Sequence, residues 1–306
     1  MLASLEIKVD SLSGSNQEFL NSLLQKMRSS LQVRFRKFVD DQVRAIEETK
    51  VKIVKKRRGV IHFFRVFPQF AIAVENILSG FSTGAVDVRH MVNDEYRRIS
   101  NAMFDALKVI ARESKGVGVS TSSTDPEDKE ALNYHILLIE NLSYFIEEIP
   151  DYGVDVLEDR KHEAIQEYER HLEQYLSSIM RRPLGKLLDY IENVEAQLQA
   201  LKAPEKIVAQ PSNSKAVFNK VLSAYDAKEV RKGIEALRKR VEKHFGDTEE
   251  SGLGGGRELV DKVTLECEKF YSKVELRIAN ITAEVYRGDV LFEWPRIEVK
   301  GAFSTR

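Results

Sequence analysis

Apolar residues recur three and four residues apart along most of the chain, which is the spacing that places side chains on one face of an α-helix. The first series predicts a long helix from about residue 17 into the cationic stretch 50–58, with Gly59 as its C-cap. A frayed or extended lead-in is expected for residues 1–16. The apolar positions of this first helix are Leu31, Phe35, Phe38, Val43 and Ile46.

The next three series predict helices that end at identifiable breaks. A phenylalanine-rich series at 63–81 stops at "GFSTG", and a series at 88–110 ends in the polar segment "SKGVGVSTSSTDPED". Asp125 followed by Pro126 marks another start, because an N-cap side chain precedes a residue with no N–H to lose. The helix after it is apolar around so much of its girth that several neighbours must bury it, and Pro150 ends it.

The second half of the chain continues the pattern. Apolar residues follow the spacing of bundle seams at 165–179 and, after Pro183, at 184–201. Residues 203–214 break the pattern and are the expected internal joint. The "DAKE" sequence at 226–229 resembles a capping box, with the aspartate reaching forward and the glutamate reaching back.

These elements predict an all-α protein of stacked antiparallel helical bundles joined by short loops. A last long helix is expected at 263–285, after the linker "DTEESGLGGG". We divide the chain into the lead-in 1–16, a first helical bundle at 17–150, a second at 151–288 and a C-terminal tail at 289–306. The tail alternates weakly, so a short extended strap is expected there.

Composition adds limits to this prediction. The formal net charge of the 306 residues is −1, so no global field attracts the chain to nucleic acid, and any electrostatic function must be local. Cys267 is the only cysteine, which excludes an intrachain disulfide and a cysteine-based zinc site and fits a reducing compartment. No apolar run is long enough to cross a bilayer. We therefore expect a cytoplasmic protein.

Candidate catalytic and metal-binding residues give little support for an enzyme. Glu158 with His162, and Glu167 with His171, are four residues apart, whereas di-iron bundles use a spacing of three, so we interpret both as surface pairs. His135 is expected in the core or at its edge. The acidic neighbours of Cys267 raise its pKa rather than lower it. We predict no catalytic residue, no metal, no cofactor and no small-molecule substrate.

The segment "KVKIVKKRRGVIHFFRVFPQF" at 50–70 has two interpretations. The first is a solvated last helical turn, whose cations favour the helix C-terminus, followed by a helix of core phenylalanines. The second is a docking patch for anionic lipid head groups or an acidic partner. Nucleic-acid binding is the weakest interpretation, because no recognisable module is present. The candidate contact residues are Lys52, Lys55, Lys56, Arg57 and Arg58.

Four segments together resemble one known family. They are "FVDDQVRAIEETKVKIVKKRRGVIHFFRVFPQF", "LNYHILLIENLSYFIEEI", "IMRRPLGKLLDYIENVEAQL" and "SAYDAKEVRKGIEALRKRVEKHFG". In this order they are similar to the carboxy-terminal region of the Sec-three subunit of the exocyst, also called exocyst complex component one, of fungal type. The similarity extends from about residue 35 to about residue 287.

This resemblance implies an elongated rod of helical bundles of the multisubunit-tethering type, in a complex that holds secretory vesicles at the plasma membrane. It implies no catalysis, other exocyst subunits as partners, and recruitment to the plasma membrane at sites of secretion. The lipid- and GTPase-binding domain of that family is not visible, so we expect Met1 to begin a fragment. The alternatives are a peripheral membrane module that binds anionic phospholipids through its basic run and, last, an unrecognised helical enzyme.

Overall fold

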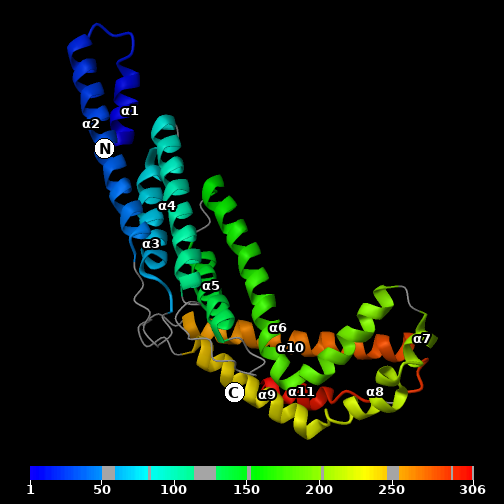
Figure 1. Ribbon diagram of the computed structural model, residues 1–306. Coiled ribbons are helices and arrows are strands. Elements are labelled where there is room, and N and C mark those ends of the chain that lie inside the picture. Colours follow the sequence, from blue (N-terminus) through cyan, green and yellow to red (C-terminus); the bar gives the residue numbers. More distant parts are fainter. Residues whose placement is uncertain are drawn as a thin grey trace. The chain divides into compact units, whose positions relative to one another are not determined.

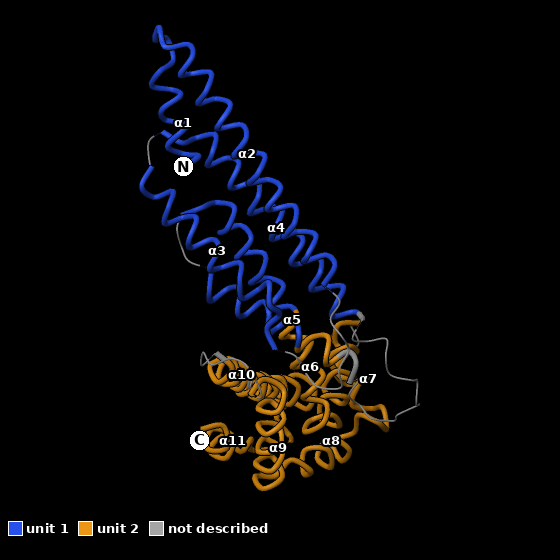
Figure 2. The backbone as a smooth tube through the Cα atoms, turned by 90° about the vertical axis from the view of Figure 1, so that its left-hand side faces the viewer, with its two compact units in different colours: residues 1–119, 137–170 blue, residues 120–136, 171–306 orange. Residues whose placement is uncertain are grey.

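The computed structural model describes residues 1–49, 59–81, 84–113, 129–149, 153–200, 203–246, 255–290 and 292–304. Regular structure within these residues is entirely helical, which confirms the predicted all-α class. Figure 1 shows the helices in chain order, and Figure 2 colours two compact units. Unit 1 comprises residues 1–119 and 137–170, and unit 2 comprises residues 120–136 and 171–306.

The predicted helical series appear in the predicted order, although two of them form one continuous helix and further short helices occur that were not predicted. The first part of the chain forms α1 (Leu2–Ser11), α2 (Glu18–Glu47), α3 (His62–Leu78), the 3₁₀ turn η1 (Ser79–Phe81) and α4 (Val86–Glu113). The middle forms α5 (Lys129–Glu148) and α6 (Asp155–Gln199). The last part forms α7 (Pro204–Val208), η2 (Pro211–Asn213), α8 (Lys215–Leu222), α9 (Ala227–Phe245), α10 (Gly255–Glu284) and α11 (Arg296–Ser304).

Packing divides the chain differently from the predicted bundles at 17–150 and 151–288. Both α5 and α6 contribute residues to each of the two units. The predicted boundary follows a proline and a loop, which are local signals, whereas a compact unit is defined by which side chains pack together. One continuous helix can therefore supply residues to two cores.

Both ends of the chain differ from prediction. Residues 2–11, expected as a frayed lead-in, form α1, and the tail expected as an extended strap contains α11. The glutamate Glu6 of α1 is buried, and its two carboxylate oxygens accept hydrogen bonds from the backbone N–H groups of Asp87 (2.8 Å) and Val88 (3.0 Å). It thus caps the first turn of α4 from a distant part of the chain. This contact docks α1 in unit 1.

The helix α2 ends earlier than predicted. Its last residue is Glu47, and the C-cap is Glu48, so Gly59 does not cap this helix. The Thr49 hydroxyl donates to the carbonyl of Ala45 (2.7 Å), which satisfies one of the last carbonyls of the helix. Gly59 nevertheless has the left-handed backbone that is typical of a glycine at a helix C-terminus, with φ of 62°, three residues before α3 begins.

The core of unit 1 is built around phenylalanine rings. Phe145 of α5 meets Phe104 of α4 edge-on, with centroids 5.2 Å apart, and contacts Phe64 and Phe67 of α3 at 6.1 and 6.2 Å. Phe64 and Phe145 are fully buried. The phenylalanines that follow the cationic run therefore belong to the core, as their helical spacing predicted.

The core of unit 2 instead uses tyrosines with their hydroxyl groups paired. Phe218 of α8 stacks between Tyr190 of α6 and Tyr286, with centroids 5.0 and 4.9 Å apart. The Tyr286 hydroxyl donates to the carbonyl of Asn213 (2.7 Å) and bonds the Tyr190 hydroxyl. Burial raises the pKa of Tyr190, so this pair stays protonated.

Local signals do fix several helix ends in unit 2. Asp226 accepts a hydrogen bond from the backbone N–H of Glu229 (2.9 Å), which confirms the forward half of the predicted capping box of α9. Ser214 caps α8 in the same way, and Pro204 occupies the first turn of α7. Pro183 was expected to separate two apolar series, but α6 is continuous through it.

Candidate interaction surfaces

The predicted cationic contact residues lie outside the described part of the chain. These are Lys52, Lys55, Lys56, Arg57 and Arg58. The chain just after them is held by Asn141 of α5, whose side-chain oxygen accepts from the backbone N–H of Ile61 (2.8 Å). Asn141 is fully buried, so the described chain at Ile61 is anchored to unit 1.

A cavity of about 360 Å³ lies between α4 and α6 in unit 1. Its charged side chains largely pair with each other. Arg160 binds Glu163 at 2.7 Å and lies over the ring of Phe104, 5.2 Å from its centroid, and Lys108 lies 3.6 Å from Glu167. Because cations and carboxylates alternate around it, this cavity presents no net charge to a ligand.

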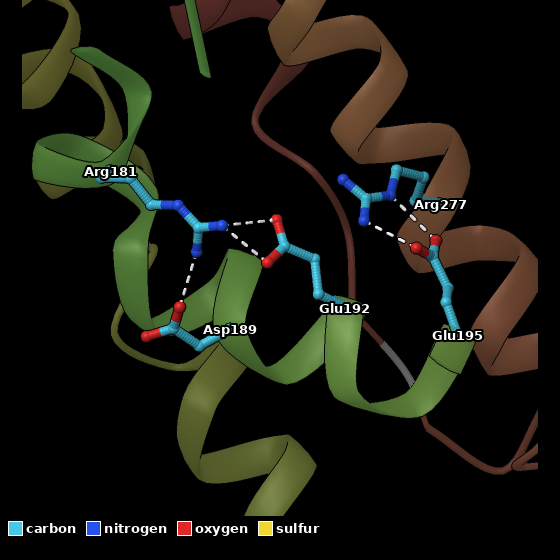
Figure 3. Close-up of polar contacts among 5 residues, drawn as sticks. All are labelled: Arg181, Asp189, Glu192, Glu195 and Arg277. Atoms are coloured by element: carbon cyan, nitrogen blue, oxygen red, sulfur yellow. Dashed lines mark hydrogen bonds and ion pairs between the residues drawn. The ribbon is translucent and has the colours of Figure 1, made fainter. Parts of the chain in front are cut away.

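In unit 2, Arg181 forms a three-residue cluster along α6 (Figure 3). Its guanidinium donates to Asp189 (2.6 Å) and, through one nitrogen, to both carboxylate oxygens of Glu192 (2.8 and 2.6 Å). Arg181 and Glu192 are 11 residues apart, which corresponds to roughly 16 Å along a straight helix. The contact therefore requires α6 to bend at Pro183, where a backbone N–H is missing.

A second arginine contact, between Arg277 and Glu195, clamps α6 to α10 within unit 2. Arg277 binds Glu195 through two nitrogens, at 2.8 and 2.6 Å (Figure 3). These hydrogen bonds with Glu195 raise the pKa of the Arg277 guanidinium above its ordinary value. Bidentate geometry of this kind fixes orientation as well as distance, so the clamp sets how the two helices face each other.

The interpretation of His171 as a surface residue is wrong. His171 is buried, and its Nδ1 lies 3.0 Å from Nδ1 of His135. Since the two nitrogens share one hydrogen bond, one ring must donate and the other accept. Tyr134 contacts both rings, with centroids 5.3 and 5.5 Å away. His135 is partly buried and lies at the edge of the core, whereas His162 lies 2.9 Å from Gln166 on an exposed helix face.

Cys267 is buried in α10 and has no features of a nucleophile. Burial raises its pKa to about 12, with a smaller contribution from the charge of Glu266. The sequence predicted this direction from the acidic neighbours alone, whereas burial is the larger cause. Across the residues that the structure describes, no group of three or more histidine, cysteine, aspartate or glutamate side chains is arranged to hold a metal ion.

No described helix is long and apolar enough to cross a membrane.

The surface that sequence analysis missed lies on α2, where exposed leucine, methionine and phenylalanine side chains follow one another along the helix. The sequence does indicate this surface, because the segment that forms α2 carries more apolar residues than one packing face requires.

Residues 1–288 match the family model described as "Exocyst complex component Sec3, C-terminal". Proteins named exocyst complex component 1 are also similar. The mouse protein is 27% identical over 231 residues (76% of this chain, 24% of the mouse protein), and the Drosophila melanogaster protein is 29% identical over 241 residues (78% of this chain, 24% of the fly protein). The Dictyostelium discoideum protein is 25% identical over 308 residues and aligns with 100% of this chain.

The chain spans 24% of the length of the mouse and fly relatives and 32% of the Dictyostelium relative. No solved structure matches it.

Proposed function

Because this chain belongs to the Sec3 family of exocyst subunits, in the C-terminal region of that family, we propose that it acts without catalysis, through contacts with other exocyst subunits. In this role it helps to hold secretory vesicles at the plasma membrane. The match of the family model over residues 1–288 is the observation that carries the proposal. Long amphipathic helices support it, because they present extended surfaces on which partner helices can pack.

Co-purification of the 306-residue chain with the remaining exocyst subunits tests this proposal. We expect the chain to retain at least one subunit through size-exclusion chromatography, and cells that lack the corresponding region to accumulate undocked secretory vesicles. A folded chain that retains no subunit, in cells that dock vesicles normally without it, would contradict the proposal.

A second candidate function concerns the cationic run. The residues Lys52, Lys55, Lys56, Arg57 and Arg58 concentrate positive charge in a chain whose net charge is −1, so we propose them as a contact for anionic phospholipids. Each cation near such a membrane contributes on the order of 1 kcal/mol.

Charge reversal tests this second function. The triple variant Lys55→Glu, Lys56→Glu, Arg57→Glu should lose binding to vesicles that contain phosphatidylserine, and the binding of the unaltered chain should weaken steeply with salt. Reversal of Lys228, Lys232 and Lys239 on the exposed face of α9 makes the same change in net charge and is the matched control. An unaltered chain that ignores these vesicles at low salt would exclude the membrane contact.

A further inference from the structure

The helix α2 carries an exposed row of apolar side chains that its own neighbours leave uncovered. Leu23 and Met27 are each 45% exposed, Phe38 is 48% exposed and Leu20 is 37% exposed. Leu31 is half-buried between them. These positions are separated by three, four, four and seven residues, so they lie on one face of the helix. We call this row, Leu20, Leu23, Met27, Leu31 and Phe38, the α2 stripe.

A different face of α2 packs inside unit 1. The fully buried Val39 follows Phe38 by one residue, which turns its side chain about 100° away from the stripe. On that side Arg28 binds Asp87 of α4 (2.8 Å), and Asp40 binds Arg98 of α4 (2.6 Å). The packing of α2 against α1 and α4 is therefore complete without the stripe.

Most of the stripe extends past the helix that could have covered it. Only Phe38, near the far end, meets α3, where its ring centroid lies 6.2 Å from that of Phe70. The 30 residues of α2 span about 45 Å, whereas the 17 residues of α3 span about 25 Å. Figures 1 and 2 both show α2 reaching beyond the end of α3. The row from Leu20 to Leu31 thus has space beside it for another helix.

Positive charge lies in and beside the stripe. Arg34 falls between Leu31 and Phe38, at three and four residues from them, and Lys26 and Lys37 border the row. All three side chains are exposed, and none forms an ion pair with another residue in the described part of the chain. A polar residue within an apolar seam fixes the register of a helix pair, because its partner must offer a matching group.

From this combination we propose that the α2 stripe is the docking site for an amphipathic helix of another protein, with apolar residues along its seam, acidic residues on its flanks and a carboxylate opposite Arg34. The spacing of three and four residues suits a helix, since its ridges fit the grooves between the stripe residues. A second copy of this chain does not fit in a parallel, in-register pair, because Lys26, Arg34 and Lys37 would face like charges. The proposal rests on α2 itself and not on the proposed function.

Two synthetic helical peptides test the chemistry of the site directly. Both carry the same leucine seam, and one has glutamate on its flanks where the other has lysine. The 306-residue chain should bind the glutamate-flanked peptide about 10-fold more tightly or better, with a preference that declines as salt is added. Equal binding of the two peptides, or no binding of either, would overturn the proposal.

Substitutions on one helix separate the stripe from its surroundings. Arg34→Glu should reverse the preference between the peptides. Arg36→Glu makes the same charge change two residues away, about 200° around the helix, and should leave the preference unchanged. The double variant Leu23→Ser, Met27→Ser should abolish binding, whereas Val33→Ser, at an apolar residue off the stripe that is 65% exposed, should not. If Arg36→Glu matched Arg34→Glu, binding would be diffuse and the proposal wrong.

Two other occupants of the α2 stripe, a second copy of the chain and a lipid surface, would each give a different experimental result. Sedimentation that detects a dimer of the chain, lost in the Leu23→Ser, Met27→Ser variant, would identify a second copy and overturn the proposal. Binding to phosphatidylserine vesicles that the same variant abolishes would identify a lipid surface, which also overturns it.

Co-purification then asks whether an exocyst subunit provides the helix, a step that depends on the proposed function. The double variant should lose one subunit from the set that the unaltered chain retains. Retention of every subunit would overturn docking of a complex member at this site. An unaltered chain that retains none would count against the proposed function alone, because the peptide measurements do not depend on it.

Discussion

Unit 1 and unit 2 are similar in helix content but differ in how they bury their cores. Unit 1 packs phenylalanine rings from three helices and leaves one side of its longest helix exposed. Unit 2 ties its helices with tyrosine hydroxyls and bidentate arginine contacts, and its exposed large apolar residues, Leu265, Leu276 and Ile297, are far apart in sequence. Ion pairs between helices occur in both units, so the difference is that unit 1 leaves one face of α2 uncovered, which is apolar surface available to a partner.

The largest expected effect comes from a charge placed in the phenylalanine-lined core of unit 1. Leu138 of α5 is 2% exposed, so Leu138→Asp strands an unpaired carboxylate in a dry site and should destabilise the fold by more than about 3 kcal/mol. Thermal unfolding followed by circular dichroism measures this. Val109→Asp, at a residue of α4 that is 50% exposed, is the control and should melt normally. An unchanged melting temperature for Leu138→Asp would contradict the burial.

A smaller effect is expected from the polar contact between Glu6 of α1 and the first turn of α4 in unit 1. Glu6→Ala leaves two backbone N–H groups of α4 without an acceptor, which should cost about 1–3 kcal/mol. Hydrogen exchange at Asp87 and Val88 should accelerate. Glu18→Ala, an exposed glutamate at the start of α2, controls for the loss of charge. Unchanged exchange at both amides would show that α1 is not held by this cap.

In unit 2, two tyrosines allow the contribution of a hydroxyl hydrogen bond to the free energy of unfolding to be measured. Tyr190→Phe removes the hydrogen bond to Tyr286 and should lower the free energy of unfolding by about 1 kcal/mol. The Tyr271 hydroxyl is buried without a hydrogen-bond partner among the described residues, so Tyr271→Phe should be neutral or stabilising. Urea unfolding compares them. If both variants lost the same free energy of unfolding, ring packing and not the hydrogen bond between Tyr190 and Tyr286 would distinguish unit 2.

A pH-dependent effect is expected at Cys267, which reports on unit 2 because it is the only cysteine. Burial raises its pKa to about 12, so at pH 8 the folded protein has almost no thiolate and should resist a thiol reagent for hours. Unfolded thiols ionise near pH 8.5. Raising the pH from 8 to 10 should therefore lower the free energy of unfolding, since only the unfolded state loses this proton. Rapid labelling at pH 8 without unfolding would contradict the burial of α10.

The candidate surfaces were only partly accessible to prediction. The cationic residues Lys52, Lys55, Lys56, Arg57 and Arg58 remain a prediction, since they lie outside the described residues. The α2 stripe was overlooked because the sequence places Leu31 and Phe38 in one apolar series with Phe35, Val43 and Ile46, and periodicity does not say which of two apolar faces a neighbour will cover. Exposure of a side chain depends on helix lengths elsewhere in the chain, here the short α3.

The sequence by itself determined what depends on neighbouring residues. Helical periodicity located α3, α4, α9 and α10, and the side chain of Asp226 set the start of α9, because hydrogen bonds and spacing within one or two turns suffice for these.

Tertiary structure decided what depends on distant residues. Glu6 caps α4 across some eighty positions, Pro183 stays inside one helix whose bend brings Arg181 to Glu192, and His171 is buried against His135. No local pattern encodes such contacts, because each joins groups from different turns or different helices whose meeting depends on how all the intervening residues pack.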